Sequence, residues 1–355
     1  MKKKGVSTLK AAAAYIGTIV GAGFATGQEV LQFFTRFGVW GLAGLAVITV
    51  LFIVFGAVIM DLGRQLQAKS HVEIIRFAAG KWIGTAIDYI VTFFLFGALT
   101  AMLAGTGALL EQQFNLPGLL GVIVMGILTA FTVLKGIHGV IDSISFVVPF
   151  LLVAVIGVCV YSIVIAPPDV TASVPAQDQS ELISNWLLSA VLYVSYNTII
   201  SIAVLGPLGA QARNRKAIGI GAVLGGLGLG LGSLMIYLAL SGQLAAVAEL
   251  EIPMIYIAGR ITFAVQMIYA VILIAEVYTT AVGSLYGLAS RLTDMEKSPV
   301  KGRWIVIGAT AAAMVASQFG FSNLVKYLYP LVGYGGIVLL ICLIYVKVRK
   351  KKIPT

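Results

Sequence analysis

The chain has 355 residues, of which 59% are hydrophobic and 11% are charged, and its mean hydropathy is +1.01. An ordinary soluble domain carries about 25% charged residues, so this composition excludes a soluble protein and predicts an all-helical chain that crosses a membrane several times. The net charge of +10 does not indicate a nucleic-acid partner. The Lys and Arg residues lie in short clusters between apolar runs, which is how membrane proteins set their orientation.

A spanning helix needs about 20 mostly apolar residues, and ten stretches are candidates. They cover residues 9–34, 39–63, 83–111, 117–135, 142–166, 182–210, 216–241, 255–291, 301–319 and 323–347. Most basic residues fall in the segments on the side of the N-terminus, so the positive-inside rule predicts a multi-pass protein of the cell membrane with both termini in the cytoplasm. Within one of these segments, residues 71–79 are predicted to form a short interfacial helix.

The first apolar run, residues 15–34, carries four glycines before Gln28 and Glu29: Gly17, Gly21, Gly23 and Gly27. Glycine lowers helix propensity by about 0.8–1 kcal/mol relative to alanine, and a carboxylate at membrane depth is costly unless it faces a cavity or a partner. The sequence therefore predicts two half-helices joined by an extended break around residues 21–24. The alternative is that the glycines serve only close helix–helix packing of the small-x-x-x-small kind.

The longest loop on the other side, residues 167–181, is rich in Pro, Asp, Ser and Gln and has no basic residue. It divides the chain into a first five-helix repeat, residues 1–166, and a second repeat of opposite orientation, residues 182–355, an arrangement typical of secondary transporters. The sixth helix then mirrors the first. Its polar residues Tyr193, Ser195, Tyr196, Asn197 and Thr198 compete for backbone hydrogen bonds, so we expect a second break near Ser195, although no Gly or Pro marks it.

Ten helices in two inverted sets of five, with interrupted first and sixth helices, resemble the leucine-transporter fold. More narrowly, residues 18–29, Thr-Ile-Val-Gly-Ala-Gly-Phe-Ala-Thr-Gly-Gln-Glu, are similar to a family of largely uncharacterised bacterial ten-helix proteins. That family belongs to the amino acid–polyamine–organocation superfamily and is usually labelled putative amino acid permeases. The resemblance implies alternating-access symport of an amino acid or related amine, coupled to Na⁺ or H⁺, by a monomer or homodimer that needs no other cofactor.

The same resemblance implies which residues bind the solute. Exposed amides after the first break, at Ala22, Gly23 and Phe24, would hold a carboxylate, in keeping with the attraction of a half-helix N-terminus for anions. The remaining residues that we expect to line the site are Gly21, Ala25, Thr26, Phe96 of the third helix, and Tyr193, Ser195, Tyr196 and Asn197 of the sixth.

Glu276 is predicted to lie near the middle of the eighth helix, and Thr279 and Thr280 share its face. In sodium-coupled members of the superfamily, this helix supplies a small-x-x-Thr-Ser pattern to a sodium site that first-helix carbonyls complete, here those of Gly17 and Val20. A carboxylate stands where a small residue is usual, so the coupling ion is either Na⁺ or a proton carried by Glu276. The alternative is that Glu276 makes a structural hydrogen bond to a neighbouring helix.

Gln28 and Glu29 follow the first break by about one turn. We expect Glu29 to neutralise a cationic group, to relay protons, or to pair with Arg260 or Lys326 as an outer gate; the alternative is a partly hydrated vestibule residue. The sequence contains no phosphate-binding loop, nucleophile elbow or zinc motif, so it does not indicate an enzyme or an ATP-driven pump. Two other functions stay open, a non-transporting amino acid sensor of the same fold and a passive channel.

Overall fold

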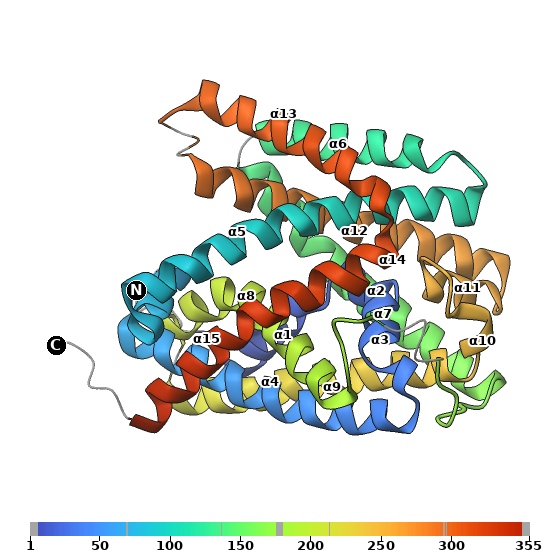
Figure 1. Ribbon diagram of the computed structural model, residues 1–355, viewed down its shortest axis with the longest axis horizontal. Coiled ribbons are helices and arrows are strands. Elements are labelled where there is room, and N and C mark those ends of the chain that lie inside the picture. Colours follow the sequence, from blue (N-terminus) through green and yellow to red (C-terminus); the bar gives the residue numbers. More distant parts are fainter. Residues whose placement is uncertain are drawn as a thin grey trace.

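Figure 1 shows a bundle of helices, most of which run across the view from left to right. The computed structural model describes residues 6–68, 70–135, 137–174, 180–212, 214–293, 295 and 297–349. Within these residues every regular element is a helix, and one isolated bridge pairs Val6 with Ala212. The predicted loop at 167–181 is therefore only partly described, because residues 175–179 lie outside the described residues, as do the basic residues at 2–4, 69, 213 and 350–352.

The first apolar run consists of three short helices, α1 (Thr8–Ile19), α2 (Ala22–Ala25) and α3 (Gln28–Phe33). Val20 and Gly21 between α1 and α2 are extended, with φ/ψ of −72°/98° and −124°/−168°. The predicted first break is thus confirmed, but its predicted extent of residues 21–24 is wrong. The extended residues are 20 and 21, and residues 22–24 are helical in α2. A second interruption, which the sequence did not predict, follows at Gly27, whose φ of +80° favours glycine because a side chain there is strained.

The other helices follow in chain order. The first half continues with η1 (Thr35–Phe37), α4 (Val39–Leu66), α5 (His71–Phe114), α6 (Gly118–Leu134) and α7 (Ile137–Ile165). The second half contains α8 (Trp186–Ala210), α9 (Arg215–Ser241), α10 (Leu244–Val247), α11 (Pro253–Gly259), α12 (Phe263–Leu292), α13 (Pro299–Ala316), η3 (Ser317–Phe319), α14 (Phe321–Asn323), the π-helical turn η4 (Leu324–Leu328) and α15 (Tyr329–Arg349).

Six helices of the described residues are long and apolar enough to span a membrane: α4, α5, α8, α9, α12 and the continuous segment Phe321–Val348. Shorter apolar helices are α6 and Phe150–Ile165. The backbone of α5 is non-helical at Gly80, with φ/ψ of 75°/−173°, so residues 71–79 form the separate short helix that the sequence predicts.

The predicted eighth span, residues 255–291, is wrong at its start. Residues 260–262 separate α11 from α12, and Thr262 caps α12 by accepting a hydrogen bond from the backbone N–H of Val265 at 3.2 Å. A threonine whose hydroxyl binds the first turn begins a new helix instead of continuing the previous one.

The predicted second break is also wrong, because α8 is continuous from Trp186 to Ala210. The amide of Asn197 donates to the carbonyl of Tyr193 at 2.9 Å, and the hydroxyl of Thr198 donates to that of Val194 at 2.7 Å. These side chains bond to carbonyls one turn back along their own helix. They leave the helix intact, since neither glycine nor proline weakens it near Ser195.

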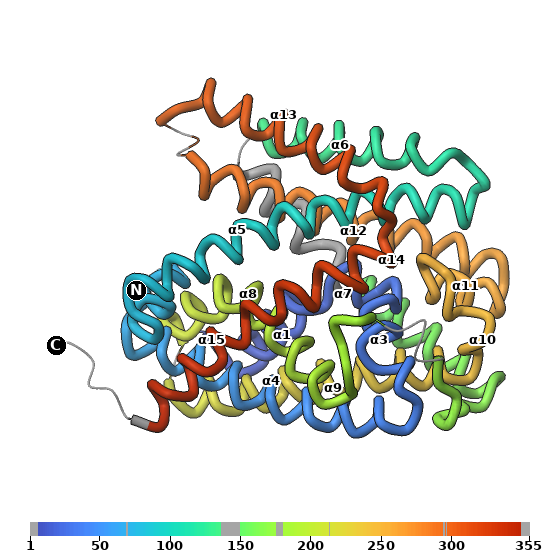
Figure 2. Tube along the Cα trace, viewed as in Figure 1, coloured from blue at the N-terminus to red at the C-terminus, as the bar shows by residue number. Residues whose placement is uncertain are grey.

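Figure 2 shows α1 and α8 in the middle of the bundle, with α5 and α12 above them and α4 and α9 below. Close backbone packing joins α4 to α8. A Cβ built on Gly63 would overlap the carbonyl oxygen of Gly206 and lie 2.8 Å from its carbonyl carbon. At the end of the bundle where α15 ends, Arg291 of α12 donates to Asp88 of α5 at 2.8 Å and also contacts His71. We call this end the basic end, and the opposite end, which carries α10 and α11, the loop end.

Candidate functional site

The break between α1 and α2 leaves backbone groups free inside the bundle. Val20 donates its N–H to the carbonyl of Ile16 at 2.8 Å, which closes α1. Among the described residues, no backbone N–H donates to the carbonyl oxygens of Gly17 and Val20. Both carbonyls are consequently available to a ligand at the centre of the fold.

The short helix α2 is buried, and two neighbouring elements hold its far end. The hydroxyl of Tyr269 on α12 donates to the carbonyl of Ala25 at 2.6 Å. The N–H of Met254 on α11 donates to the carbonyl of Thr26 at 3.0 Å. The first span therefore depends on the second half of the chain for its hydrogen bonds.

Glu276 lies on the face of α12 that turns towards this break. Tyr269 reaches Ala25, and the hydroxyl oxygen of Thr280 lies 3.8 Å from where a Cβ on Gly21 would stand. Positions 269, 273, 276 and 280 share one helix face, so Glu276 lies between the two contacts. Its side chain is 3% exposed, and its Oε2 has no hydrogen-bond partner among the described residues.

The two threonines predicted to act with Glu276 do different things. Thr280 faces Gly21, as described above. Thr279 donates its hydroxyl to the carbonyl of Glu276 at 2.9 Å, within its own helix. The structure therefore brings Glu276, Thr280 and the broken segment together, whereas the hydroxyl of Thr279 bonds to α12.

Glu29 forms a second buried polar centre. Glu29 is 6% exposed, and its carboxylate accepts a hydrogen bond from the hydroxyl of Tyr196 on α8 at 2.7 Å. A Cβ built on Gly23 would overlap Oε1 of Glu29 and lie 2.9 Å from Cδ. The carboxylate thus packs directly against α2, and Arg260, its predicted partner, is exposed.

Tyr196 and four aromatic residues around it form what we call the aromatic cluster: Phe33, Phe94, Tyr193, Tyr196 and Tyr329. The ring centroid of Tyr196 lies 5.1 Å from that of Tyr329 and 5.5 Å from that of Tyr193. Phe94 of α5 lies 5.5 Å from Tyr329 and 6.0 Å from Tyr196, and Phe33 lies 5.7 Å from Tyr196. These rings come from four parts of the chain, α3, α5, α8 and α15.

Several buried polar atoms near these centres have no hydrogen-bond partner among the described residues. They include both side-chain polar atoms of Gln28 and Gln32 and Oε2 of Glu276. An unsatisfied buried polar group costs about 1–3 kcal/mol. Such groups cluster where a protein has a role for them, so this level of the bundle is a candidate ligand site.

Other predicted site residues serve the scaffold. Ser195 donates to the carbonyl of Gly333 on α15 at 2.5 Å, and Asn197 bonds to its own helix. Phe96 is partly buried, whereas Phe94 is the residue of α5 that contacts the aromatic cluster. The sequence prediction missed Phe94, Gln32, Ser233 and Tyr329. The only signal for Gln32 was its spacing, four residues after Gln28 on the same helix face.

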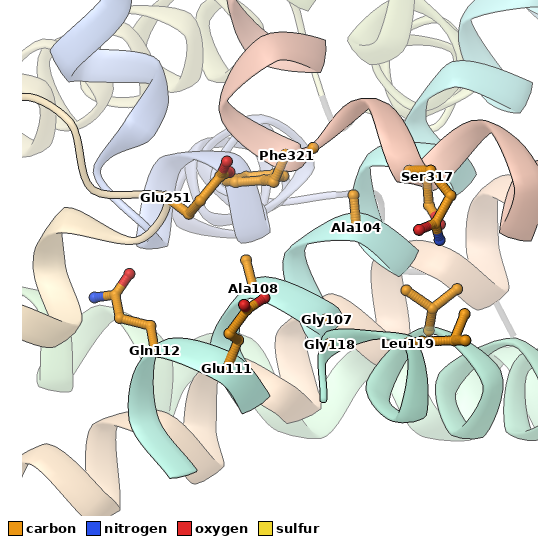
Figure 3. Close-up of a pocket in the computed structure, with 13 residues that line it drawn as sticks. Ala104, Gly107, Ala108, Glu111, Gln112, Gly118, Leu119, Glu251, Ser317 and Phe321 are labelled. Atoms are coloured by element: carbon orange, nitrogen blue, oxygen red, sulfur yellow. The ribbon is translucent and has the colours of Figure 1, made fainter. Parts of the chain in front are cut away.

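Two cavities open at opposite ends of the bundle. The cavity at the loop end measures about 310 Å³ and is lined by residues of α5, α6 and the α13–α14 junction. Figure 3 shows Glu111 and Gln112 of α5 on one side of it and Glu251 with Phe321 on the other. The cavity at the basic end measures about 470 Å³ and includes Asp61, Arg215 and Lys347. Neither is lined by the broken segment or by the aromatic cluster.

Glu251 joins the loop before α11 to the start of α14. Its carboxylate accepts a hydrogen bond from the N–H of Ser322 at 2.6 Å. Burial raises the pKa of Glu251 above its usual value, and this outweighs the backbone hydrogen bonds that lower it. Gln112 binds the same loop, since it exchanges hydrogen bonds with the backbone of Ile252 at 3.1 and 3.2 Å.

The described residues contain no group of three or more His, Cys, Asp or Glu side chains that could hold a metal ion. The candidate cation ligands at the break are therefore one carboxylate, hydroxyls and backbone carbonyls, which are oxygen donors suited to hard cations and not to zinc or copper.

No protein-family model matches the chain. Over 334 residues, which make up 94% of the chain and 94% of the relative, it is 33% identical to the uncharacterized membrane protein YkvI of Bacillus subtilis (strain 168). The chain belongs to the YkvI family. The uncharacterized protein YyaD of the same organism is 27% identical over 341 residues, 95% of this chain and 96% of YyaD.

Solved structures share the fold of this YkvI-family chain at low sequence identity. MhsT in complex with L-phenylalanine has a TM-score of 0.64 and 16% identity over 96% of this chain and 89% of that one. The inward-facing conformation of Mhp1 has a TM-score of 0.71 and 13% identity over 99% and 81%. A Na⁺-coupled sialic acid symporter has a TM-score of 0.65 and 11% identity over 95% and 79%. The predicted leucine-transporter fold of a multi-pass membrane protein is thus confirmed.

Proposed function

We propose that this protein is a cation-coupled secondary transporter that moves a small solute, an amino acid or related amine, across the cell membrane by alternating access. The proposal includes membership of the amino acid–polyamine–organocation superfamily, cytoplasmic termini and two inverted five-helix repeats. The observation that carries it is the break at Val20 and Gly21, which faces Glu276 and Thr280 of α12 inside a fold shared with cation-coupled carriers.

The coupling cation binds between α1 and α12 in this proposal. The carbonyls of Gly17 and Val20, Oε2 of Glu276 and the hydroxyl of Thr280 supply oxygen ligands. Unwound carbonyls are the usual ligands of Na⁺ in transporters with broken helices. A proton on Glu276 would serve instead if the protein is proton-coupled, since an intramembrane carboxylate is a candidate proton carrier.

The solute binds next to α2 in this proposal. Residues 21–26 and the polar side chains Gln28, Tyr193 and Tyr196 contribute to this site, and Ser195 and Asn197 stabilise its wall. The cation site lies about one helical turn before α2, and Glu29 lies about one turn after it on the same broken span. A cation bound at residues 17 and 20 therefore affects the backbone against which the solute binds.

Uptake into proteoliposomes tests the proposal. Purified protein is reconstituted, and accumulation of radiolabelled amino acids and amines is measured with an inward Na⁺ gradient, with a proton gradient and with neither. We expect accumulation only when one of the gradients is present. In Glu276→Gln, concentrative uptake is lost but exchange of internal for external solute persists, because the solute site remains. Glu249→Gln, the same change at an exposed carboxylate, serves as the matched control.

The alternatives give different results in the same vesicles. A sensor binds a solute without gradient-driven flux, and a channel conducts without saturation. Accumulation by Glu276→Gln at the level of the unmodified protein would remove Glu276 from the coupling mechanism.

A further inference from the structure

The carboxylate of Glu29 packs against α2 beside Gly23, one of the residues expected to hold a carboxylate of the solute. A Cβ atom built on Gly23 would overlap Oε1 of Glu29 and lie 2.9 Å from Cδ of the same carboxylate. The protein thus supplies a carboxylate of its own at this place. A solute that brings a second carboxylate to the same wall of α2 would be repelled, because like charges disfavour each other in a buried site.

Glu29 has no basic partner among the residues that the structure describes. No salt bridge of the described residues includes it, although its residue is only 6% exposed. Its carboxylate accepts a hydrogen bond from the neutral hydroxyl of Tyr196. Buried carboxylates are ordinarily paired with a cation, so the missing positive charge is a requirement that a ligand can meet.

The surroundings of Glu29 suit an organic cation. Tyr196 binds the carboxylate, and the rings of Tyr329 and Phe94 lie 5.1 Å and 6.0 Å from its ring. Aromatic faces attract an ammonium group within about 6 Å of their centroids. A cation next to Glu29 would therefore lie beside a carboxylate and the hydroxyl of Tyr196, whose ring belongs to the aromatic cluster.

The orphaned amides add hydrogen-bonding capacity at this level. Gln28 directly precedes Glu29, and Gln32 lies one turn further along α3; both are buried and both lack a partner among the described residues. An amide oxygen accepts hydrogen bonds from an ammonium group, whereas none of these side chains carries a positive charge that could pair with a solute carboxylate.

We propose that the solute is an organic ammonium cation without a carboxylate, and that Glu29 is its counter-ion within the aromatic cluster. This inference rests on the proposed transport function and selects the amine in place of the amino acid. It assigns Glu29 to solute binding and leaves ion coupling to Glu276. The aromatic rings select for charge, because a neutral solute of the same shape gains neither the cation–π attraction nor the ion pair.

Matched pairs of compounds test the assignment. Phenethylamine and isopentylamine differ from L-phenylalanine and L-leucine only by lacking the carboxylate, and 2-phenylethanol lacks the charge. Binding is measured at neutral pH as a saturable rise in the melting temperature of the purified protein; primary amines are protonated there, as lysine is with its pKa of about 10.4. We expect the amines to bind and the amino acids and the alcohol not to bind.

The variant Glu29→Gln keeps the size of the side chain and removes its charge. We expect its affinity for phenethylamine to fall roughly ten- to hundredfold, the loss typical of one charge-assisted hydrogen bond, whereas Glu249→Gln binds as the unmodified protein does. If Glu29→Gln does not fold, Tyr329→Leu and Tyr329→Phe replace it: the leucine variant loses amine affinity and the phenylalanine variant, which keeps the ring, retains it.

Several results would overturn the assignment: binding of the amino acids but not the amines, no binding of any amine, or unchanged amine affinity in Glu29→Gln. The last result is also the one expected if Glu29 is protonated, since a neutral side chain cannot be the counter-ion of an amine. Proteoliposome uptake separates this failure from that of the proposed function. Glu29-dependent amine binding without gradient-driven uptake refutes transport but not the ammonium site. Gradient-driven uptake of an amino acid that does not require Glu29 supports transport but refutes the ammonium site.

Discussion

Gly23→Ala is the most direct test of how Glu29 is positioned. The new methyl group would overlap Oε1 of Glu29 and lie 2.9 Å from Cδ and 3.1 Å from Cγ. Every one of these atoms belongs to the flexible end of a side chain, so α2 keeps its place and the carboxylate moves. We therefore expect a folded protein in which Glu29 no longer reaches Tyr196.

The size of the effect follows from what is lost and gained. A hydrogen bond to a charged group contributes about 1.5–3 kcal/mol, and alanine in a helix is more favourable than glycine by about 0.8–1 kcal/mol. The net loss of unfolding free energy is roughly 0.5–2 kcal/mol. The affinity for phenethylamine falls as well, because the displaced carboxylate no longer lies next to the rings of the aromatic cluster.

A double-mutant cycle with Tyr196→Phe distinguishes displacement of Glu29 from a general disturbance of α2. If the methyl group acts by separating Glu29 from Tyr196, the second substitution adds little in the Gly23→Ala background, since the hydrogen bond is already gone. Melting temperature and phenethylamine affinity are measured for the four proteins. Additive losses in both quantities would refute the reasoning.

Two further changes test the scaffold. Gly63→Ala is expected to lower the melting temperature by disrupting α4–α8 packing, because its methyl group meets the rigid backbone carbonyl of Gly206. The control Gly219→Ala on α9, where a Cβ has no neighbouring atom within 4 Å, is expected to be neutral or stabilising. Equal melting temperatures of the two variants would contradict this expectation. The raised pKa of Glu251 means that the folded state binds its proton more tightly, so this contribution to stability is present below pH 4.5 and is lost as the pH rises through the folded pKa. The melting temperature of Glu251→Gln relative to that of the unmodified protein should therefore increase from acid to neutral pH, and a difference that does not depend on pH would count against it.

The apolar spans were predictable because a membrane fixes both their length and their hydrogen bonding. The break at Gly21 was predictable for a related reason, since a run of glycines in a buried span weakens the helix locally. The continuity of α8 at Ser195 was not predictable in this way. Polar side chains either interrupt a helix or bond back to it, and Ser195 finds its partner in the carbonyl of Gly333 on α15, a contact that no local pattern reveals.

The candidate site was only partly predictable for the same reason. Glu29 and Glu276 stood out as carboxylates in apolar runs, but the partner of Glu29 is Tyr196, 167 positions away. Phe94, and not Phe96, is the ring of α5 that contacts the aromatic cluster, because the direction of a side chain depends on how its helix is rotated against its neighbours. Long-range packing, and not propensity, decides these assignments.

The uninterrupted course of α8 makes the two halves of the protein mechanically unequal. A continuous rod of 25 residues tilts as one piece, so the second half offers no flexible point at the level of Ser195. The non-helical residues of the central pair of spans are residues 20, 21 and 27 of the first. In the proposed function, the peptide units closest to the coupling cation would therefore also serve as the hinge, which couples occupancy of the cation site directly to the shape of the protein.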